Sequence, residues 1–138
     1  MSKFKFSKRS EENLRGVHPD LVKVTRRAIE LTNIDFMVIE GKRTEARQRQ
    51  LVKNGASQTM NSRHLTGHAV DCAPLVNREI PWNDWSKFKL VADAMLQAAK
   101  ELNVDLEWGG NWKSFKDGPH FQLTHCCGQV FLDTPIRW

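Results

Sequence analysis

The sequence lacks any run of about eighteen apolar residues, the length that a membrane-spanning helix requires. Its first residues, MSKFKFSKRSEEN, are basic but contain no apolar stretch of the kind found in secretory signal peptides. These two absences exclude a membrane span. They also predict a protein without a signal peptide, which remains in a cytoplasm unless a partner moves it.

Cysteine is scarce, with three residues at Cys72, Cys126 and Cys127. An odd number of cysteines without a secretory signal argues against a disulfide framework. The adjacent pair lacks the two-residue gap that a zinc knuckle requires. We therefore interpret the cysteines as free thiols.

The sequence also lacks internal repeats, low-complexity segments and long linkers, and its 138 residues predict a single domain over 1–138. Hydrophobic residues make up 40% of the chain, which is enough for a core, and the charge is high but mixed in sign. A formal charge of +5 is compatible with a polyanionic partner, either nucleic acid or a bacterial envelope. The densest basic segment, GKRTEARQR, contains an acidic residue and has helical spacing, which favours a solvated helix face over a nucleic-acid patch.

Apolar residues recur at helical spacing in three segments, which predicts helices at 18–33, 44–55 and 85–103. A shorter helix is expected at SKRSEENL, with Ser10 as its N-cap. Thr44 is expected to cap the second long helix, and Gly55 to follow its end. The apolar stripe of the third long helix is predicted to comprise Phe88, Val91, Met95, Ala98 and Leu102.

Short β-rich segments predict strands at 35–41, 68–74, 104–110 and 119–124, the fourth being the last. These strands and the helices do not alternate in a βαβ rhythm. We therefore predict an α+β fold with a small, mostly antiparallel sheet packed against helices.

The segment SRHLTGHAVDCAP contains the first candidate chemical group. His64 and His68 have the i, i+4 spacing of a zinc-binding helix, but Leu65 stands where such a helix carries glutamate, and Gly67 interrupts it. A loop leading into a strand is the better interpretation. His64 would then end the loop, Asp71 would lie on the strand, and His68 would be a bystander at the surface.

The segment KDGPHFQLTH, about fifty residues later, contains the second group. His120 is expected at the start of a strand, and Asp117 on the loop before it. Two imidazoles and one carboxylate form the ligand set of a catalytic zinc site, which keeps a fourth position for water. Such a site also needs a further group to take the proton of the water, and Asp117 has the right chemistry. Ordinary polar roles for these residues remain the alternative.

Three motifs together resemble a known family. SRHLTGHAVD is similar to the SxHxxGxAxD motif of the zinc D-Ala-D-Ala peptidase superfamily, which includes the VanY-type peptidases. WGGNWKSFKDGPHFQL resembles the WGGDW and PHFQ block of the phage endolysin branch, and EGKRTEARQRQLVKNGAS resembles its GxRTxxxQxxL segment. The chain thus resembles bacteriophage L-alanyl-D-glutamate peptidases, endolysins that cut the stem peptide of peptidoglycan, and a Hedgehog/DD-peptidase-like fold is implied.

The resemblance implies a role for each motif residue. One zinc ion per chain would be bound by His64, Asp71 and His120. Asp117 would act as the general base, and Arg43 would polarise the scissile carbonyl and stabilise the oxyanion.

Three further residues bear on the substrate. The resemblance places Ser62 near it. Trp112, with Trp108, forms either a wall for the substrate or part of the core. Asn111 stands where the branch often has aspartate, which puts any charged role there in doubt.

The resemblance also implies partners and a location. The substrate would be peptidoglycan, and the protein would be a monomer with neither a nucleic-acid partner nor membrane insertion. It would be made in the host cytoplasm and released to the cell wall at lysis, through a membrane hole made by a holin-type partner.

Two other functions remain open from the sequence. A D-Ala-D-Ala carboxypeptidase or dipeptidase would share the zinc ligands. A non-catalytic, zinc-stabilised module for binding the cell wall would need neither Asp117 nor Arg43.

Overall fold

A four-stranded antiparallel sheet with the order β1–β2–β4–β3 lies at the centre of the computed structural model, which describes residues 4–55, 63–112, 116–126 and 129–130. The strands are β1 Phe36–Glu40, β2 Ala69–Pro74, β3 Leu106–Trp108 and β4 His120–Leu123. All four lie within the segments expected to be strands, and the α+β class is confirmed.

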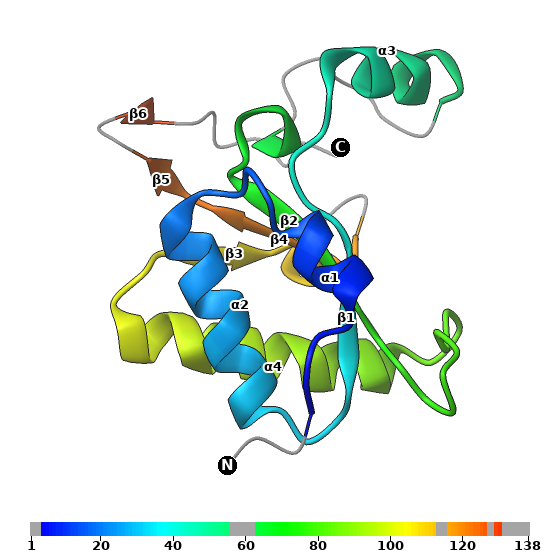
Figure 1. The fold of residues 1–138 in the computed structure, drawn as a ribbon, viewed down its shortest axis with the longest axis vertical. Coiled ribbons are helices and arrows are strands. Elements are labelled where there is room, and N and C mark those ends of the chain that lie inside the picture. Colours follow the sequence, from blue (N-terminus) through cyan, green and yellow to red (C-terminus); the bar gives the residue numbers. More distant parts are fainter. Residues whose placement is uncertain (1–3, 56–62, 113–115, 127–128, 131–138) are drawn as a thin grey trace.

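Two helices, α2 (Pro19–Leu31) and α4 (Trp85–Leu102), pack against each other beneath one face of the sheet (Figure 1). Pro19 occupies the first turn of α2, where its missing N–H costs no hydrogen bond. No helix within the described ranges combines the length and the apolar character needed to cross a membrane. The core lies between the two helices and the sheet and includes Leu21, Val24, Val38, Val70, Met95 and Phe121.

The helix α3 (Glu45–Lys53) lies away from α2 and α4, at the other end of the molecule in Figure 1. Thr44 caps it as expected, because its side chain accepts a hydrogen bond from the N–H of Arg47. Gly55 follows the helix with a positive φ of 78°. The segment around α3 is mostly exposed, in agreement with the expected solvated face.

Some local expectations are corrected. The helix α1 (Lys8–Asn13) is capped by Ser7 and not by Ser10. Ser10 lies inside α1, where its hydroxyl accepts a hydrogen bond from the N–H of Val38 and so ties α1 to β1. The buried stripe of α4 ends at Ala98 and Ala99, and Leu102 is 41% exposed.

A two-stranded ribbon of β5 (His125–Cys126) and β6 (Gln129–Val130) follows β4. The strand expected to be the last is therefore followed by two more. Short pairs of this kind carry too little apolar alternation to be recognised from sequence.

The pleat of the central strands places core residues on one face of the sheet and the residues of the candidate site on the other. Phe121 and Leu123 of β4 belong to the core, so His120 and Gln122 lie on the opposite face of the sheet. In the antiparallel pairing of β2 with β4, Asp71 lies directly opposite His120. Directly opposed side chains on one face are close neighbours, so strand register alone brings these two groups together.

A β-bulge in β1 adds a further polar residue to this face. Val38 pairs with Cys72 and Glu40 pairs with Asp71, so Ile39 is an extra residue between them. A bulge changes the direction in which the following side chain points. Here it brings Glu40 next to Asp71, at the rim of the candidate site.

Candidate metal centre and its pocket

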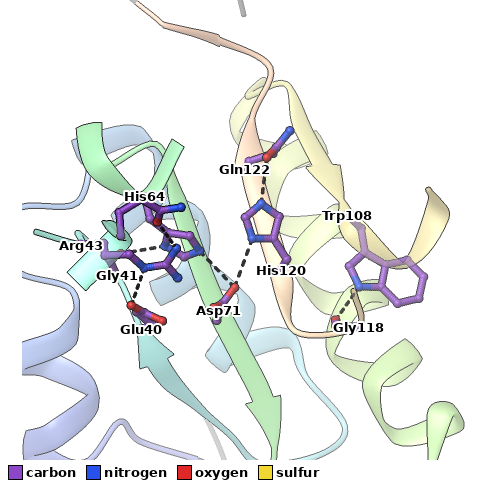
Figure 2. A network of polar contacts seen from close by, with 10 residues as sticks. Glu40, Gly41, Arg43, His64, Asp71, Trp108, Gly118, His120 and Gln122 are labelled. Carbon is purple, nitrogen blue, oxygen red and sulfur yellow. Dashed lines mark hydrogen bonds and ion pairs between the residues drawn. The ribbon is translucent and has the colours of Figure 1, made fainter. Parts of the chain in front are cut away.

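Three potential metal ligands from separate segments converge on the face of the sheet opposite to α2 and α4 (Figure 2). His64 Nε2 lies 3.3 Å from Asp71 Oδ1, and His120 Nδ1 lies 3.2 Å from the same oxygen. The exposed fractions of the three residues are 0%, 2% and 1%. The structure thus brings together all three residues that were predicted as ligands.

His64 is held by a backbone carbonyl. Its Nδ1 lies 2.8 Å from the carbonyl oxygen of Gly41 and donates to it, which directs Nε2 toward Asp71. His64 lies on a 3-10 turn, η1 (Arg63–Thr66), which is closed by Gly67 with a φ of +80°. A Cβ at Gly67 would lie 2.4 Å from the carbonyl oxygen of Gly16, so glycine is required at this motif position.

His120 is held by side chains. Its Nε2 lies 2.8 Å from Gln122 Oε1, while Nδ1 faces Asp71. The indole ring of Trp112 packs beside the imidazole, with the ring centroids 5.2 Å apart. Glu107 in turn accepts a hydrogen bond from the indole N–H of Trp112.

The donor set and its spacing fit a zinc ion. Ligand atoms at 2.0–2.1 Å from a tetrahedral ion lie about 3.3 Å from one another, and the two observed nitrogen–oxygen distances are 3.2 and 3.3 Å. The outer nitrogen of each imidazole faces an oxygen acceptor, as is usual for metal-bound histidines. Three protein ligands would leave one position for water or substrate, as in catalytic sites.

The ionised form of the Asp71 carboxyl group is strongly favoured over the neutral form. Complete burial would by itself raise the pKa of the carboxyl group, but the adjacent His64 and His120 outweigh that effect and lower it. Asp71 is therefore ionised at neutral pH, which is the state that binds a metal.

A pocket of about 380 Å³ opens beside this centre. Asp71, Asp117 and Arg43 all line it, together with the exposed Trp82 from the segment before α4. The predicted base and the predicted arginine thus share one pocket with a predicted ligand.

Asp117 lies on a tight turn between η2 (Gly109–Asn111) and β4. Its N–H donates to the carbonyl oxygen of Gly109 at 3.0 Å, and its own carbonyl oxygen accepts from the N–H of His120 at 3.3 Å. A Cβ at Gly109 would lie 2.6 Å from Asp117 O and 3.1 Å from His120 Cβ. The absence of a side chain at Gly109 therefore permits the predicted base and a predicted ligand to lie close to each other.

Gly109→Ala should consequently lower both stability and activity. We expect about 1–3 kcal/mol less free energy of unfolding, because the new methyl group must displace the turn of Asp117. Thermal unfolding and peptidoglycan hydrolysis would be measured on the same preparation. Wild-type values for both would show that the turn can accommodate the methyl group without displacing Asp117.

Trp108 fixes the other side of the same turn. Its indole N–H donates to the carbonyl oxygen of Gly118 at 2.7 Å (Figure 2). Its ring packs against that of Trp85, with the ring centroids 5.6 Å apart. A Cβ at Gly110 would lie 2.2 Å from the Trp108 ring. The WGG motif thus shapes the turn that carries Asp117, and Trp108 is a core residue that is 4% exposed.

Arg43 is buried and tightly held. Its Nε donates to Glu40 Oε1 and one terminal nitrogen donates to Gln48 Oε1, each at 2.7 Å. The backbone N–H of Arg43 donates to the carbonyl oxygen of His64 at 2.8 Å, which fixes the arginine segment to the ligand turn. A guanidinium held from several sides is well ordered for binding a developing negative charge.

The remaining residues that the sequence analysis singled out lie in different surroundings. Trp112 is 4% exposed, packs beside His120 and is not among the residues that line this pocket, which favours the core interpretation over a substrate wall. Asn111 is exposed. Ser62 and Cys127 lie outside the described residues. Cys72 is a free, buried cysteine, and burial raises the pKa of its thiol.

The sequence had suggested that His68 lies at the surface, but the residue is buried, with an exposed fraction of 8%. Its Nδ1 lies 2.5 Å from Thr66 Oγ1 and its ring is 5.1 Å from that of His18. Burial is the largest cause that lowers the pKa of His68, and the nearby His18 and Arg63 lower it further. It is not part of the three-residue cluster, in agreement with its role as a bystander.

Comparison with known proteins agrees with this geometry. Residues 1–125 match the model of the family described as phage L-alanyl-D-glutamate peptidase. The chain belongs to this family.

Individual members of this peptidase family and related proteins show the same likeness. The chain is 44% identical over 117 residues to the L-alanyl-D-glutamate peptidase of Escherichia phage T5, covering 83% of this chain and 85% of that protein. It is 31% identical to the peptidoglycan L-alanyl-D-glutamate endopeptidase CwlK of Bacillus subtilis (strain 168), over 65% of this chain and 61% of that protein. The crystal structure of the Serratia marcescens L-Ala D-Glu endopeptidase ChiX superimposes with a TM-score of 0.82 and 51% identity, covering 88% of this chain and 92% of that chain.

Three supporting residues were not assigned a role from the sequence. Gln48 and Gln122 stand within quoted motifs, and each bonds a predicted functional residue. The spacing of Gln122 two positions after His120 on a strand is a signal that could have revealed it. Glu40 had no such signal, because its position depends on the β-bulge.

Proposed function

We propose that this chain is a phage endolysin, a zinc-dependent peptidase that hydrolyses the L-Ala–D-Glu bond of the peptidoglycan stem peptide. A single catalytic domain over 1–138 with one zinc ion would carry the activity. The main support is the convergence of His64, Asp71 and His120 beside a pocket that Asp117 and Arg43 also line, in a chain of this peptidase family.

The residues divide the chemistry among them. Zinc held by the three ligands would supply a Lewis acid that lowers the pKa of a water molecule to about 7. Asp117 accepts the proton of the attacking water and returns it to the leaving amine. Arg43 donates hydrogen bonds to the carbonyl oxygen as that oxygen becomes negative.

The pocket also bears on the alternatives. A non-catalytic binding module would gain nothing from a buried arginine and a carboxylate beside its metal. A D-Ala-D-Ala carboxypeptidase would use the same groups, so the geometry does not separate it from an endopeptidase. Membership of the L-alanyl-D-glutamate peptidase family favours the L-Ala–D-Glu bond.

Digestion of purified peptidoglycan, followed by mass spectrometry of the new termini, tests this assignment. We expect a new amino terminus on D-glutamate. Free D-alanine as the main product would instead indicate a carboxypeptidase, and binding without any new terminus would indicate a binding module.

The proposal includes the setting of the enzyme. It would act as a monomer, be made in the host cytoplasm and reach the cell wall through a membrane opening made by a holin-type protein. Neither nucleic acid nor membrane insertion is needed for this activity.

Arg43→Ala should lower kcat by a factor of about 10² to 10³, more than it raises KM, because its hydrogen bonds strengthen when the oxyanion forms. Arg43→Lys should restore only part of the rate, since one ammonium group cannot contact Glu40, Gln48 and substrate as a planar guanidinium can. Steady-state kinetics on a soluble stem peptide would measure both constants. A wild-type kcat in Arg43→Ala would remove the arginine from the reaction.

A further inference from the structure

Gln122 is a buried amide in the middle of the sheet. It is 1% exposed and lies on β4 between Ala69 of β2 and Glu107 of β3, which are its register partners. A buried amide is stable only where its polar atoms find partners. The partner of Gln122 Oε1 is Nε2 of His120, at 2.8 Å.

This contact bears on which nitrogen of His120 is free to bind a metal ion. A carbonyl oxygen can only accept, so Nε2 is the donor in this contact. Nδ1 faces Asp71 Oδ1 at 3.2 Å (Figure 2). A carboxylate can also only accept, so it favours a proton on Nδ1 in the metal-free protein, and a metal ion between the two atoms would replace that proton. If the amide were reversed, its NH₂ group would instead need the lone pair on Nε2, which opposes metal binding at Nδ1.

We propose that Gln122 is a positioning residue whose Oε1 accepts a hydrogen bond from Nε2–H of His120 and so orients the ring with Nδ1 as its metal-binding atom. The inference rests on the proposed function in taking the metal to be zinc. Gly41 supports His64 in the corresponding way, because its backbone carbonyl oxygen accepts the hydrogen bond from His64. A change of side chain at position 41 does not remove that carbonyl. Gln122 is therefore the side chain through which this outer support can be varied.

The surroundings also explain why the acceptor is an amide and not a carboxylate. Glu107 is paired with Gln122 across the strands, and its side chain accepts from the indole N–H of Trp112. A second carboxylate at position 122 would stand beside Glu107, and like charges directly opposite each other on a sheet are unfavourable. An amide supplies the same acceptor without that repulsion.

The experiment compares two variants of Gln122. Gln122→Met keeps the approximate shape and removes the acceptor, whereas Gln122→Glu keeps an acceptor and removes every possible donor. Zinc affinity would be measured by competition with a chelator. The hydrogen bond from Nε2–H of His120 would be followed through the rate at which this proton exchanges with water in ¹H–¹⁵N spectra of the zinc-loaded protein, with His120→Ala used to assign its signal.

We expect Gln122→Met to bind zinc about 10- to 100-fold more weakly and its Nε2–H proton of His120 to exchange with water faster than in the wild type. Gln122→Glu should retain the slow exchange and a zinc affinity nearer to the wild type. Gln48→Met is the matched control, because it removes another fully buried amide, which contacts Arg43, and should leave zinc affinity unchanged. Thermal unfolding of each variant would establish that it is folded.

Two results would overturn the proposal. One is wild-type zinc affinity and a wild-type exchange rate of the Nε2–H proton in folded Gln122→Met. The other is a Gln122→Glu variant that binds zinc more weakly than Gln122→Met, which would mean that the amide donates to His120. Both readouts are independent of hydrolysis, so a wild-type protein that binds zinc but cuts no stem peptide would refute the proposed function and leave this inference standing.

Discussion

Asp117→Asn is expected to bind zinc like the wild type and to hydrolyse peptidoglycan about 10² to 10⁴ times more slowly, the usual contribution of a general acid–base group. Asp117 is 6% exposed and lines the pocket beside Asp71, but it is not one of the three residues that converge as ligands. Asparagine preserves the shape of the side chain and cannot accept the proton. Metal content and hydrolysis rate would therefore separate in this variant.

The matched control is Asp93→Asn, which makes the same change at an exposed ion pair with Lys89 on α4. This control should cleave at the wild-type rate. If Asp117→Asn also did so, the base would have to be another carboxylate of the pocket. Glu40 would be the next to test, although it already accepts from Arg43.

Loss of a metal ligand should have the largest effect of all. His64→Ala, Asp71→Ala and His120→Ala are each expected to lose bound zinc, and hydrolysis should fall to the background rate. Each change removes one of the three predicted ligands that converge within the described part of the chain. Metal analysis of the purified variants measures the first outcome directly, and full zinc retention in any of them would remove that residue from the site.

His68→Gln is the control for these variants, because His68 is a buried histidine four positions from His64 that lies outside the cluster. It should retain zinc.

Removal of zinc from the wild type should also lower its thermal stability. A ligand present at 1,000 times its dissociation constant stabilises the folded state by about 4.1 kcal/mol. Unfolding with and without a chelator would show this difference in the wild type, and no difference in a variant that has lost the site.

The sequence was sufficient for those parts of the fold that depend on local pattern. Helical periodicity located α2 and α4, and β-rich segments located the four strands of the sheet. The first cap was misplaced because Ser7 and Ser10 are chemically equal candidates three positions apart. Only the contact of Ser10 with Val38 of β1 separates them.

The candidate site also has one part that the sequence predicted and one part that it did not. The predicted ligands carried a recognisable motif, and the structure brings them together. The groups that orient them depend on pairing between distant strands, which no local pattern encodes. Glu40 faces Arg43 because of a bulge, and Trp112 supports His120 because the turn after β3 buries its indole ring. A tryptophan near an active site is equally compatible with a substrate wall until its exposure is known.

The pairing of β2 with β4 has a consequence for the biosynthesis of the enzyme. Asp71 and His120 are 49 positions apart, and the whole of α4 is translated between them. A contact of such long sequence separation carries a large loop-closure cost and cannot form before both of its strands have been synthesised. A nascent chain that has not yet emerged from the ribosome as far as β4 therefore lacks one of the three predicted ligands. Hydrolytic capacity would arise only after β4 has been synthesised, and abortive fragments ending before β4 would be inert.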